Sequence, residues 1–229
     1  MWSAVIDGFS HILQYFYLAS KVLHVPSYGL AIIFFTIAVK AILFPLTRTQ
    51  MRSMRVMQEL QPKIKAIQER YKDKPEKANQ AIMKLYQESG ANPFSGCLPL
   101  LIQMPIIFAL FSTLRVFFDP VKHPPFVDLS KAEFLWIGNL GQPDPIILPL
   151  LTVIATFGQQ YMSSMATAGK IDQTQRTMLI VMPLFVGWIA RNLPAGLTLY
   201  WVVFSLVSAI EMIVINRSVK AEKGERSKA

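Results

Sequence analysis

Residues 29–46 read GLAIIFFTIAVKAILFPL, an apolar run interrupted by Thr36 and Lys40. A helix needs about 20 residues of this kind to cross the hydrocarbon core of a bilayer, so we interpret the run as a membrane span. At about 1.5 Å per residue, Lys40 lies roughly 9 Å from the C-terminal end of that helix. A lysine at such depth costs about 2.5–3.5 kcal/mol by insertion scales and is usually functional, facing a polar cavity or a partner. Lys40 is therefore the first candidate for a functional residue.

The composition of the chain indicates an integral membrane protein. Of the 229 residues, 52% are hydrophobic and 16% are charged, whereas a soluble domain carries about 25% charged residues. The net charge of +9 is compatible with a nucleic-acid partner, but the basic residues gather between apolar runs, so we expect no direct nucleic-acid specificity. A single cysteine, Cys97, excludes an internal disulfide framework. The scattered histidines predict no metal site, and we expect no cofactor.

Hydropathy predicts an all-α protein with five membrane spans. The runs at 29–46, 97–118 and 193–215 are long and apolar, and the run at 145–162 ends in two glutamines. The run at 178–190 is short for a span unless the threonines before it enter the bilayer. Together these runs predict a five-helix transmembrane core formed by residues 28–46 and 94–217.

The distribution of Lys and Arg predicts the orientation of these spans. Most of the 23 basic residues lie in three places. These are segment 47–93, the loop between the third and fourth spans, and the C-terminal tail 218–229 with the residue just before it. Cytoplasmic loops carry such an excess, so we place these segments in the cytoplasm. The N-terminus is then outside and the C-terminus cytoplasmic, as an odd number of spans requires.

The N-terminal segment 1–27 predicts an amphipathic helix in the outer interface of the membrane. It lacks the basic start of a standard signal peptide, and whether a signal peptide was removed stays open. Its apolar residues recur at helical spacing: Trp2, Val5, Ile6, Phe9, Ile12, Leu13 and Phe16.

Segment 47–93 predicts a cytoplasmic helical hairpin. One apolar seam runs through Met57, Leu60, Ile64, Ile67 and Tyr71, and a second through Ala78, Ile82 and Leu85. The residues 73–75 (DKP) separate the two helices. Methionine side chains adapt to many apolar partners, so the hairpin is a candidate for recruiting clients through Met51, Met54, Met57, Arg70 and Lys74.

Polar residues on several spans predict a hydrophilic groove that is open to the cytoplasm and closed on the outside. They lie at middle or inner depth, whereas a through-pore needs polar groups at both ends. The candidate groove residues are Lys40, Thr36, Gln103, Gln159, Gln160, Tyr200 and Trp201.

Several alternatives stay open for these residues. Lys40 is able to form a static ion pair with Glu211, near the cytoplasmic end of the fifth span. Gln103 is able to bond a carbonyl freed by Pro105. Tyr200 and Trp201 are equally suited to packing, and spacing does not decide which of the two glutamines at 159 and 160 faces inward.

No catalytic constellation is visible, so we expect the protein not to be an enzyme. The sequence has no HExxH motif, no paired intramembrane aspartates and no glycine-rich phosphate loop. Two other classes are weighed. A small-solute transporter or channel predicts internal repeats with midplane ion sites, which are not found, and a non-catalytic assembly scaffold does not require Lys40.

Three stretches carry a resemblance to a known family. They are TIAVKAILFPLTRTQMRSM at 36–54, LQPKIKAIQERYKDKPEKANQAIMKLYQESGANPFSGCLPLLIQMPIIFAL at 60–110, and LPAGLTLYWVVFSLVSAIEMIVINR at 193–217. They strongly resemble the YidC membrane protein insertases of the YidC/Oxa/Alb family, most specifically in NPFSGCLPLLIQMPI at 92–106.

The resemblance implies an insertase and chaperone of the bacterial cytoplasmic membrane that moves nascent hydrophobic segments into the bilayer without nucleotide hydrolysis. It implies five helices around a groove, a flexible cytoplasmic hairpin and ribosome contact through basic segments, and it leaves contact with the Sec translocon open. The large periplasmic domain of some members is absent, so the chain looks like the short form. The groove cation of the family is usually arginine, and this chain has Lys40, which keeps the charge but loses the bidentate fork.

Overall fold

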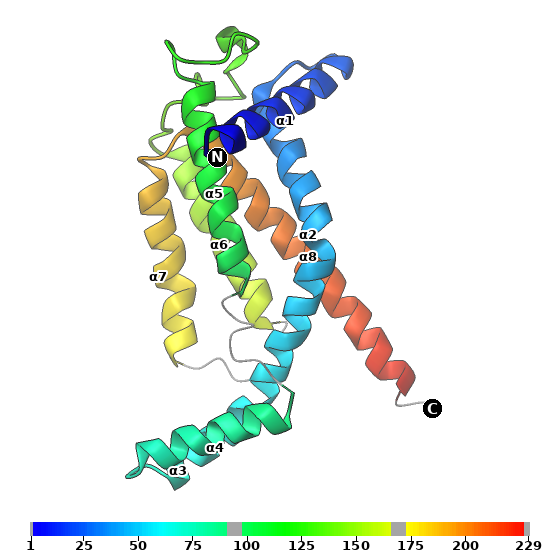
Figure 1. Cartoon of the computed structure of the whole chain (residues 1–229), viewed down its shortest axis with the longest axis vertical. Helices are drawn as coiled ribbons and strands as arrows, with labels where there is room; N and C mark the ends of the chain where they lie inside the picture. The colour runs from blue at the N-terminus through cyan, green and yellow to red at the C-terminus, as the bar shows by residue number, and fades with distance from the viewer. Residues whose placement is uncertain (1, 91–97, 166–172, 227–229) are drawn as a thin grey trace. The chain divides into compact units, whose positions relative to one another are not determined.

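The computed structural model describes residues 2–90, 98–165 and 173–226, and the regular elements in these ranges are helices (Figure 1). An isolated bridge between Phe134 and Ile137 is the one strand-like feature of the described residues. The all-α prediction is confirmed. The elements are α1 (Trp2–Val22), α2 (Tyr28–Glu59), α3 (Gln61–Arg70), α4 (Pro75–Glu88), α5 (Leu98–Phe117), η2 (Leu129–Lys131), α6 (Ile147–Met165), α7 (Gln173–Ala190) and α8 (Ala195–Arg226).

The chain forms two compact units. The first contains α1, α2 as far as Leu43, α5 from Met104, and α6 to α8. The second contains α2 from Phe44, then α3 and α4, and α5 as far as Gln103. Lys40 belongs to the first unit and the predicted hairpin to the second.

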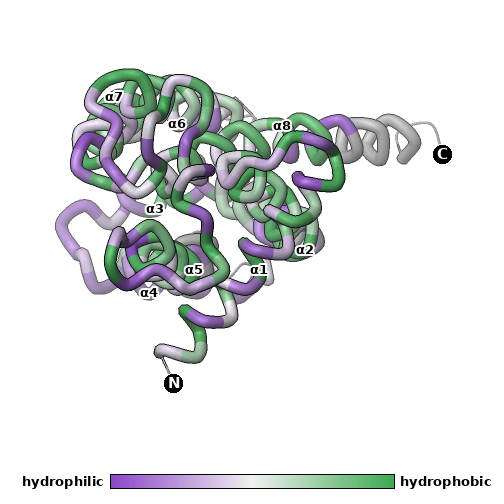
Figure 2. The backbone as a smooth tube through the Cα atoms, turned by 90° about the horizontal axis from the view of Figure 1, so that it is seen from above, coloured by the Kyte–Doolittle hydropathy of each residue, from purple (hydrophilic) through white to green (hydrophobic). Residues whose placement is uncertain are grey.

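Each predicted span coincides with a helix. Among the described residues, two helices are long and apolar enough to cross a membrane: Tyr28–Met54 with a mean hydropathy of 2.3, and Ala195–Arg217 with 2.0. Green marks their hydrophobic residues in Figure 2. α7 has 18 residues, more than its apolar run suggests, and extends for about 27 Å at 1.5 Å per residue.

Helix α6 is the common neighbour of two other helices of the first unit. α6 lies against both α7 and α8. The contact of α6 with α7 depends on Gly187, since a Cβ atom there would meet the Val153 side chain at 2.3 Å. Small residues allow helix backbones to approach closely in a membrane, where no hydrophobic effect drives helices together.

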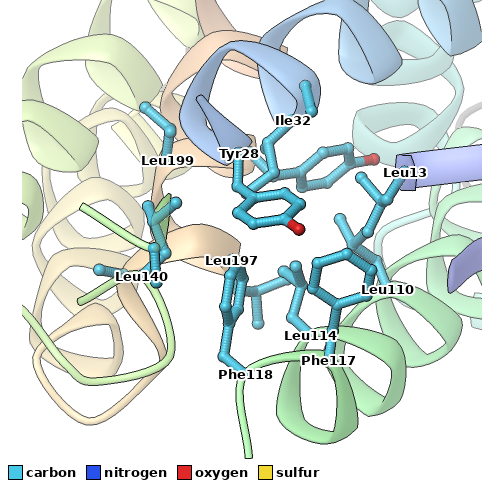
Figure 3. Packing of buried hydrophobic residues seen from close by; sticks show 14 of the residues in the cluster. Leu13, Tyr28, Ile32, Leu110, Leu114, Phe117, Phe118, Leu140, Leu197 and Leu199 are labelled. Atoms are coloured by element: carbon cyan, nitrogen blue, oxygen red, sulfur yellow. The ribbon is translucent and has the colours of Figure 1, made fainter. Parts of the chain in front are cut away.

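An aromatic cluster around Tyr28 joins four segments of the first unit (Figure 3). The Tyr28 ring stacks on Tyr17 at a centroid distance of 4.2 Å and meets the edges of Phe117 and Phe118 at 5.1 and 5.7 Å. The Tyr28 hydroxyl accepts a hydrogen bond from the amide of Asp128 at 3.0 Å. Tyr28 is 1% exposed. This one side chain therefore ties α1, α2, α5 and the loop before α6 together.

The loop between α5 and α6 is held by its own polar contacts. The Ser130 hydroxyl and amide donate to the Asp128 carboxylate, and these two hydrogen bonds hold the pKa of Asp128 below its ordinary value. The Phe134 ring lies directly on Gly29 of α2, where a Cβ atom would meet the ring at 2.1 Å. A side chain at position 29 would displace this loop.

Asp144 caps the start of α6. Its Oδ1 atom accepts hydrogen bonds from the amides of Ile146 and Leu148, each at 3.0 Å, and its Oδ2 atom accepts one from the Trp136 indole at 3.1 Å. The first amides of a helix have no partner within the helix, so this carboxylate satisfies that of Leu148 and also holds Ile146, the residue before the helix.

Replacing Asp144 with alanine is expected to lower the free energy of unfolding by about 1 kcal/mol, as for other lost helix caps. Thermal unfolding of the purified protein in detergent measures this change. Asp144→Asn is the matched control, because asparagine caps nearly as well. Equal losses in both variants would contradict the capping role.

The residues of the predicted apolar stripe on the N-terminal helix divide into an exposed and a packed group. α1 forms as expected, but Trp2, Val5 and Ile12 are exposed. Leu13 and Tyr17 are buried, and the Phe9 and Phe16 rings lie 5.7 and 6.3 Å from that of Phe35. The face that packs on the bundle is thus narrower than the predicted stripe.

The second unit contains a helical hairpin of α3 and α4, which pack on each other. Its seam includes Ile64 and Ala78, both buried. The first predicted arm is not continuous, because α2 ends at Glu59 and α3 begins at Gln61. Pro62 explains the break, since proline lacks the amide hydrogen and clashes with the preceding turn.

Candidate functional site

Lys40 forms a buried ion pair with Glu211. The Lys40 Nζ atom on α2 lies 2.5 Å from the Glu211 Oε2 atom on α8. The two residues are 5% and 7% exposed, and both belong to the first unit. The partner that the sequence left open for Lys40 is therefore the one it has in the structure.

An aromatic ring covers the same ammonium group. Lys40 Nζ lies 4.5 Å from the centroid of the Phe204 ring. Phe204 in turn lies 5.8 Å from the ring of Tyr200, one turn earlier on α8. The face of an aromatic ring attracts a cation, more strongly where water is excluded. The ammonium is thus enclosed by one carboxylate and one ring of the same helix.

The ion pair makes the two helices depend on each other energetically. Removing two charges from water costs several kcal/mol per ion, and their attraction offsets this cost only with good geometry. A complete pair therefore contributes little net stability, whereas one partner alone leaves a buried charge without compensation. Any change at Lys40 or Glu211 affects the other residue.

The first unit also contains several buried hydroxyl groups. Thr36 donates to the Ile32 carbonyl at 2.7 Å and Ser208 to the Phe204 carbonyl at 2.7 Å, so both bond to their own helices. Three further buried hydroxyl groups have no hydrogen-bond partner among the residues that the structure describes: Thr113, Thr156 and Ser205. Buried polar atoms are rarely left unpaired, so these positions suit contact with water or with a polar ligand.

The other predicted groove residues differ in burial. Tyr200 is 1% exposed and belongs to the hydrophobic core, as the packing alternative allowed. Trp201 is half-buried. Gln159 and Gln160 on α6 are both half-buried, so burial does not distinguish them. Gln103 is half-buried and belongs to the second unit.

The predicted recruitment residues fall into two groups. Met51 is buried, and Met54 and Met57 are half-buried, so the methionines do not form an open surface in this structure. Arg70 and Lys74 are exposed at the turn between α3 and α4. Of the five predicted recruitment residues, the two basic ones are therefore the ones open to solvent.

Sequence reasoning missed Phe204, Thr113 and Thr156. The spacing of four residues between Tyr200 and Phe204 places both rings on one face of α8. That periodicity is the signal that would have identified Phe204. The two threonines gave no comparable signal, because threonine often bonds to its own helix in membrane spans. Across 2–90, 98–165 and 173–226, no group of three or more His, Cys, Asp or Glu residues is placed to hold a metal ion.

Comparison with protein families identifies one match. The family model described as "60Kd inner membrane protein" matches residues 18–223. This range contains the ion pair, the hairpin and every member of the aromatic cluster except Tyr17.

Curated relatives named "Membrane protein insertase YidC" are similar along most of the chain. The protein of Caldanaerobacter subterraneus subsp. tengcongensis is 39% identical over 88% of this chain and 91% of its own length. That of Clostridium perfringens is 38% identical over 88% of this chain and 84% of its own. That of Geobacter metallireducens is 38% identical over 94% of this chain, which spans only 37% of that longer protein.

A solved structure has a similar fold. It is described as "Active YidC insertase crystal structure with the first transmembrane domain resolved" and superposes with a TM-score of 0.68 at 29% sequence identity. The match covers 92% of this chain and 46% of that one.

Proposed function

Because the chain belongs to the YidC family of membrane protein insertases, we propose that it moves nascent hydrophobic segments and their short polar tails from the cytoplasm into the bilayer. The observation that carries this proposal, beside the family match, is a buried cation within a helical bundle whose surface is apolar. An intramembrane cation is a functional site by default.

We propose that α2, α5, α6, α7 and α8 all span the membrane. Each exposes large apolar side chains, which in water would form an unfavourable surface. Ile42, Phe108, Ile154, Leu184 and Ile210 are one example from each helix. The shortest of the five, α7, still reaches about 27 Å, close to the hydrocarbon thickness of about 30 Å.

The orientation is proposed from charge. Segment 47–93 and the tail 218–229 lie in the cytoplasm because they carry the basic residues. The N-terminal helix α1 then lies in the outer interface, and its exposed Trp2 and Ile12 suit contact with lipid. A bacterial inner membrane is the location that the family description indicates.

We propose that the polar groups of the first unit form a hydrophilic groove for the polar tail of a client. Thr36 and Lys40 supply a hydroxyl and a positive charge from α2, and the half-buried glutamines 159 and 160 supply amides from α6. An acidic residue in the tail is attracted to Lys40 more strongly than in water, because the surroundings have a low dielectric constant. The apolar part of the client meanwhile enters lipid directly.

The basic segments are proposed as the recruitment surface. Arg70 and Lys74 are exposed and suit contact with the ribosome or with the acidic flank of a client.

The function is tested by reconstitution into protein-free lipid vesicles. A client with one hydrophobic segment and a short acidic tail is expected to insert only in vesicles that contain the purified protein, without added nucleotide. Protease protection of the tail measures insertion. Vesicles with an unrelated five-span membrane protein serve as the control.

The alternatives predict other outcomes. A scaffold would give no tail protection above the control, and this result would overturn the proposed function. A channel would release a small trapped solute from the vesicles, whereas an insertase with a closed outer end retains it.

A further inference from the structure

We propose that Glu211 is a resident carboxylate that an acidic client residue displaces from Lys40, so that Glu211 determines how strongly the protein prefers acidic over neutral tails. This inference rests on the proposed function. It assigns a specificity-determining role to a residue that lies on the last helix of the bundle.

The chemistry of the site leaves one place for a carboxylate. Among the residues whose burial the structure describes, Lys40 is the only buried cation, and Glu211 and Asp144 are the only buried carboxylates. Asp144 is committed to the cap of α6. Glu211 Oε2 is already paired with Lys40 Nζ at 2.5 Å, and the centroid of the Phe204 ring lies 4.5 Å from the same Nζ atom. A client carboxylate therefore reaches the ammonium at close range only if Glu211 moves away.

The position of Glu211 makes such a movement feasible. It lies six residues before the end of the apolar run Ala195–Arg217, which is about 9 Å along a helix. A long charged side chain near a helix end is able to turn its head group toward water. Glu211 therefore has a second, hydrated position within reach when another carboxylate takes its place at Lys40.

The exchange sets how strongly the site prefers an acidic tail. A client with an acidic tail replaces one carboxylate with another, so the ammonium remains paired throughout. A client with a neutral tail offers no replacement, and the Lys40–Glu211 pair stays closed. The preference for acidic over neutral tails is thus weaker with Glu211 present than it would be if Lys40 had no resident carboxylate. Clients with few acidic residues are affected most.

The test compares two clients that differ only in the tail, one with glutamates and one with glutamines at the same positions. In reconstituted vesicles, the ratio of acidic to neutral insertion is measured for the wild type and for Glu211→Gln. The ratio is expected to rise about fivefold or more in the variant, the lower end of the range for coupled binding sites. An unchanged ratio, with wild-type insertion intact, would overturn the role of Glu211 and leave the proposed function standing.

Two variants separate this role from a structural one. Glu211→Asp keeps the carboxylate with one methylene less and is expected to give an intermediate ratio. Lys40→Gln/Glu211→Gln removes both charges and is expected to bring the ratio close to one, since neither tail then meets a charge at this site. If Glu211 only supported the fold, Glu211→Gln would reduce insertion of both clients equally, and this result would also overturn the inference.

A measurement on the wild type decides the question if Glu211→Gln does not fold. Modification of the Glu211 carboxylate by a water-soluble carbodiimide is followed by mass spectrometry during titration with each client. The acidic client is expected to increase the modification and the neutral client to leave it unchanged. Equal modification with both clients would contradict the exchange, whereas absence of insertion in the wild type would reject the proposed function itself.

Discussion

Replacing Lys40 with methionine is expected to destabilise the protein by up to about 3–5 kcal/mol, the loss for a Glu211 carboxylate that stays buried without an opposite charge. The long apolar side chain of methionine fills much of the space of lysine, so lost packing contributes little. The distance of 2.5 Å and the burial of both residues distinguish this pair from a surface ion pair, which contributes at most about 1 kcal/mol. The large effect is a property of the unpaired carboxylate.

The double variant Lys40→Met/Glu211→Met separates the two contributions. It is expected to be as stable as the wild type or more stable, since apolar replacements of buried ion pairs are often neutral or stabilising. Thermal unfolding of all four proteins in the same detergent gives the coupling between the two positions. A single Lys40 variant with wild-type stability would show that the pair does not form in the membrane.

This result determines how the function of Lys40 is tested. A single Lys40 variant that fails to insert clients loses both a binding group and stability. The double variant removes only the charges. Its preference for acidic tails is therefore the informative measurement.

Replacing Tyr28 with alanine is expected to lower the free energy of unfolding by about 3–5 kcal/mol, as for other large aromatic residues removed from a core. Tyr28 is 1% exposed and contacts three aromatic rings. The cavity would lie where α1, α5 and the loop meet α2 (Figure 3). Thermal unfolding measures the loss, and protease sensitivity of the loop 119–144 reports whether it detaches.

Tyr28→Phe is the matched control. It keeps the ring and removes only the hydroxyl that accepts from the Asp128 amide, so about 0.5–1.5 kcal/mol is expected, the net value of one hydrogen bond. Equal losses in Tyr28→Ala and Tyr28→Phe would show that the hydrogen bond, and not the ring, is the main contribution.

The helices were predictable because their signal is local. Apolar runs of sufficient length, ended by residues such as Pro194 or the pair at 92–93, are visible in the sequence alone. Pro62 also marks the break before α3 in the sequence, but the prediction of that arm used only its apolar spacing. Periodicity also identified the apolar residues of α1, but it shows which residues share a face and not which of them pack on other helices.

The candidate site was predictable only in part. A lysine within an apolar run is recognisable from sequence, because placing its charge in a membrane costs free energy and is rare without a function. Its partner is not, since Glu211 and Phe204 come from a distant part of the chain and only packing brings them to Lys40. Met51 was expected on an adaptable surface and is buried, because sequence does not reveal which turn of a long helix another element covers.

The ion pair joins two helices that are far apart in the chain, α2 and α8. Chains fold from the N-terminus onward during translation, so α2 is synthesised well before α8. In that interval Lys40 is without its resident carboxylate. Packing of α8 against α2 then neutralises the charge.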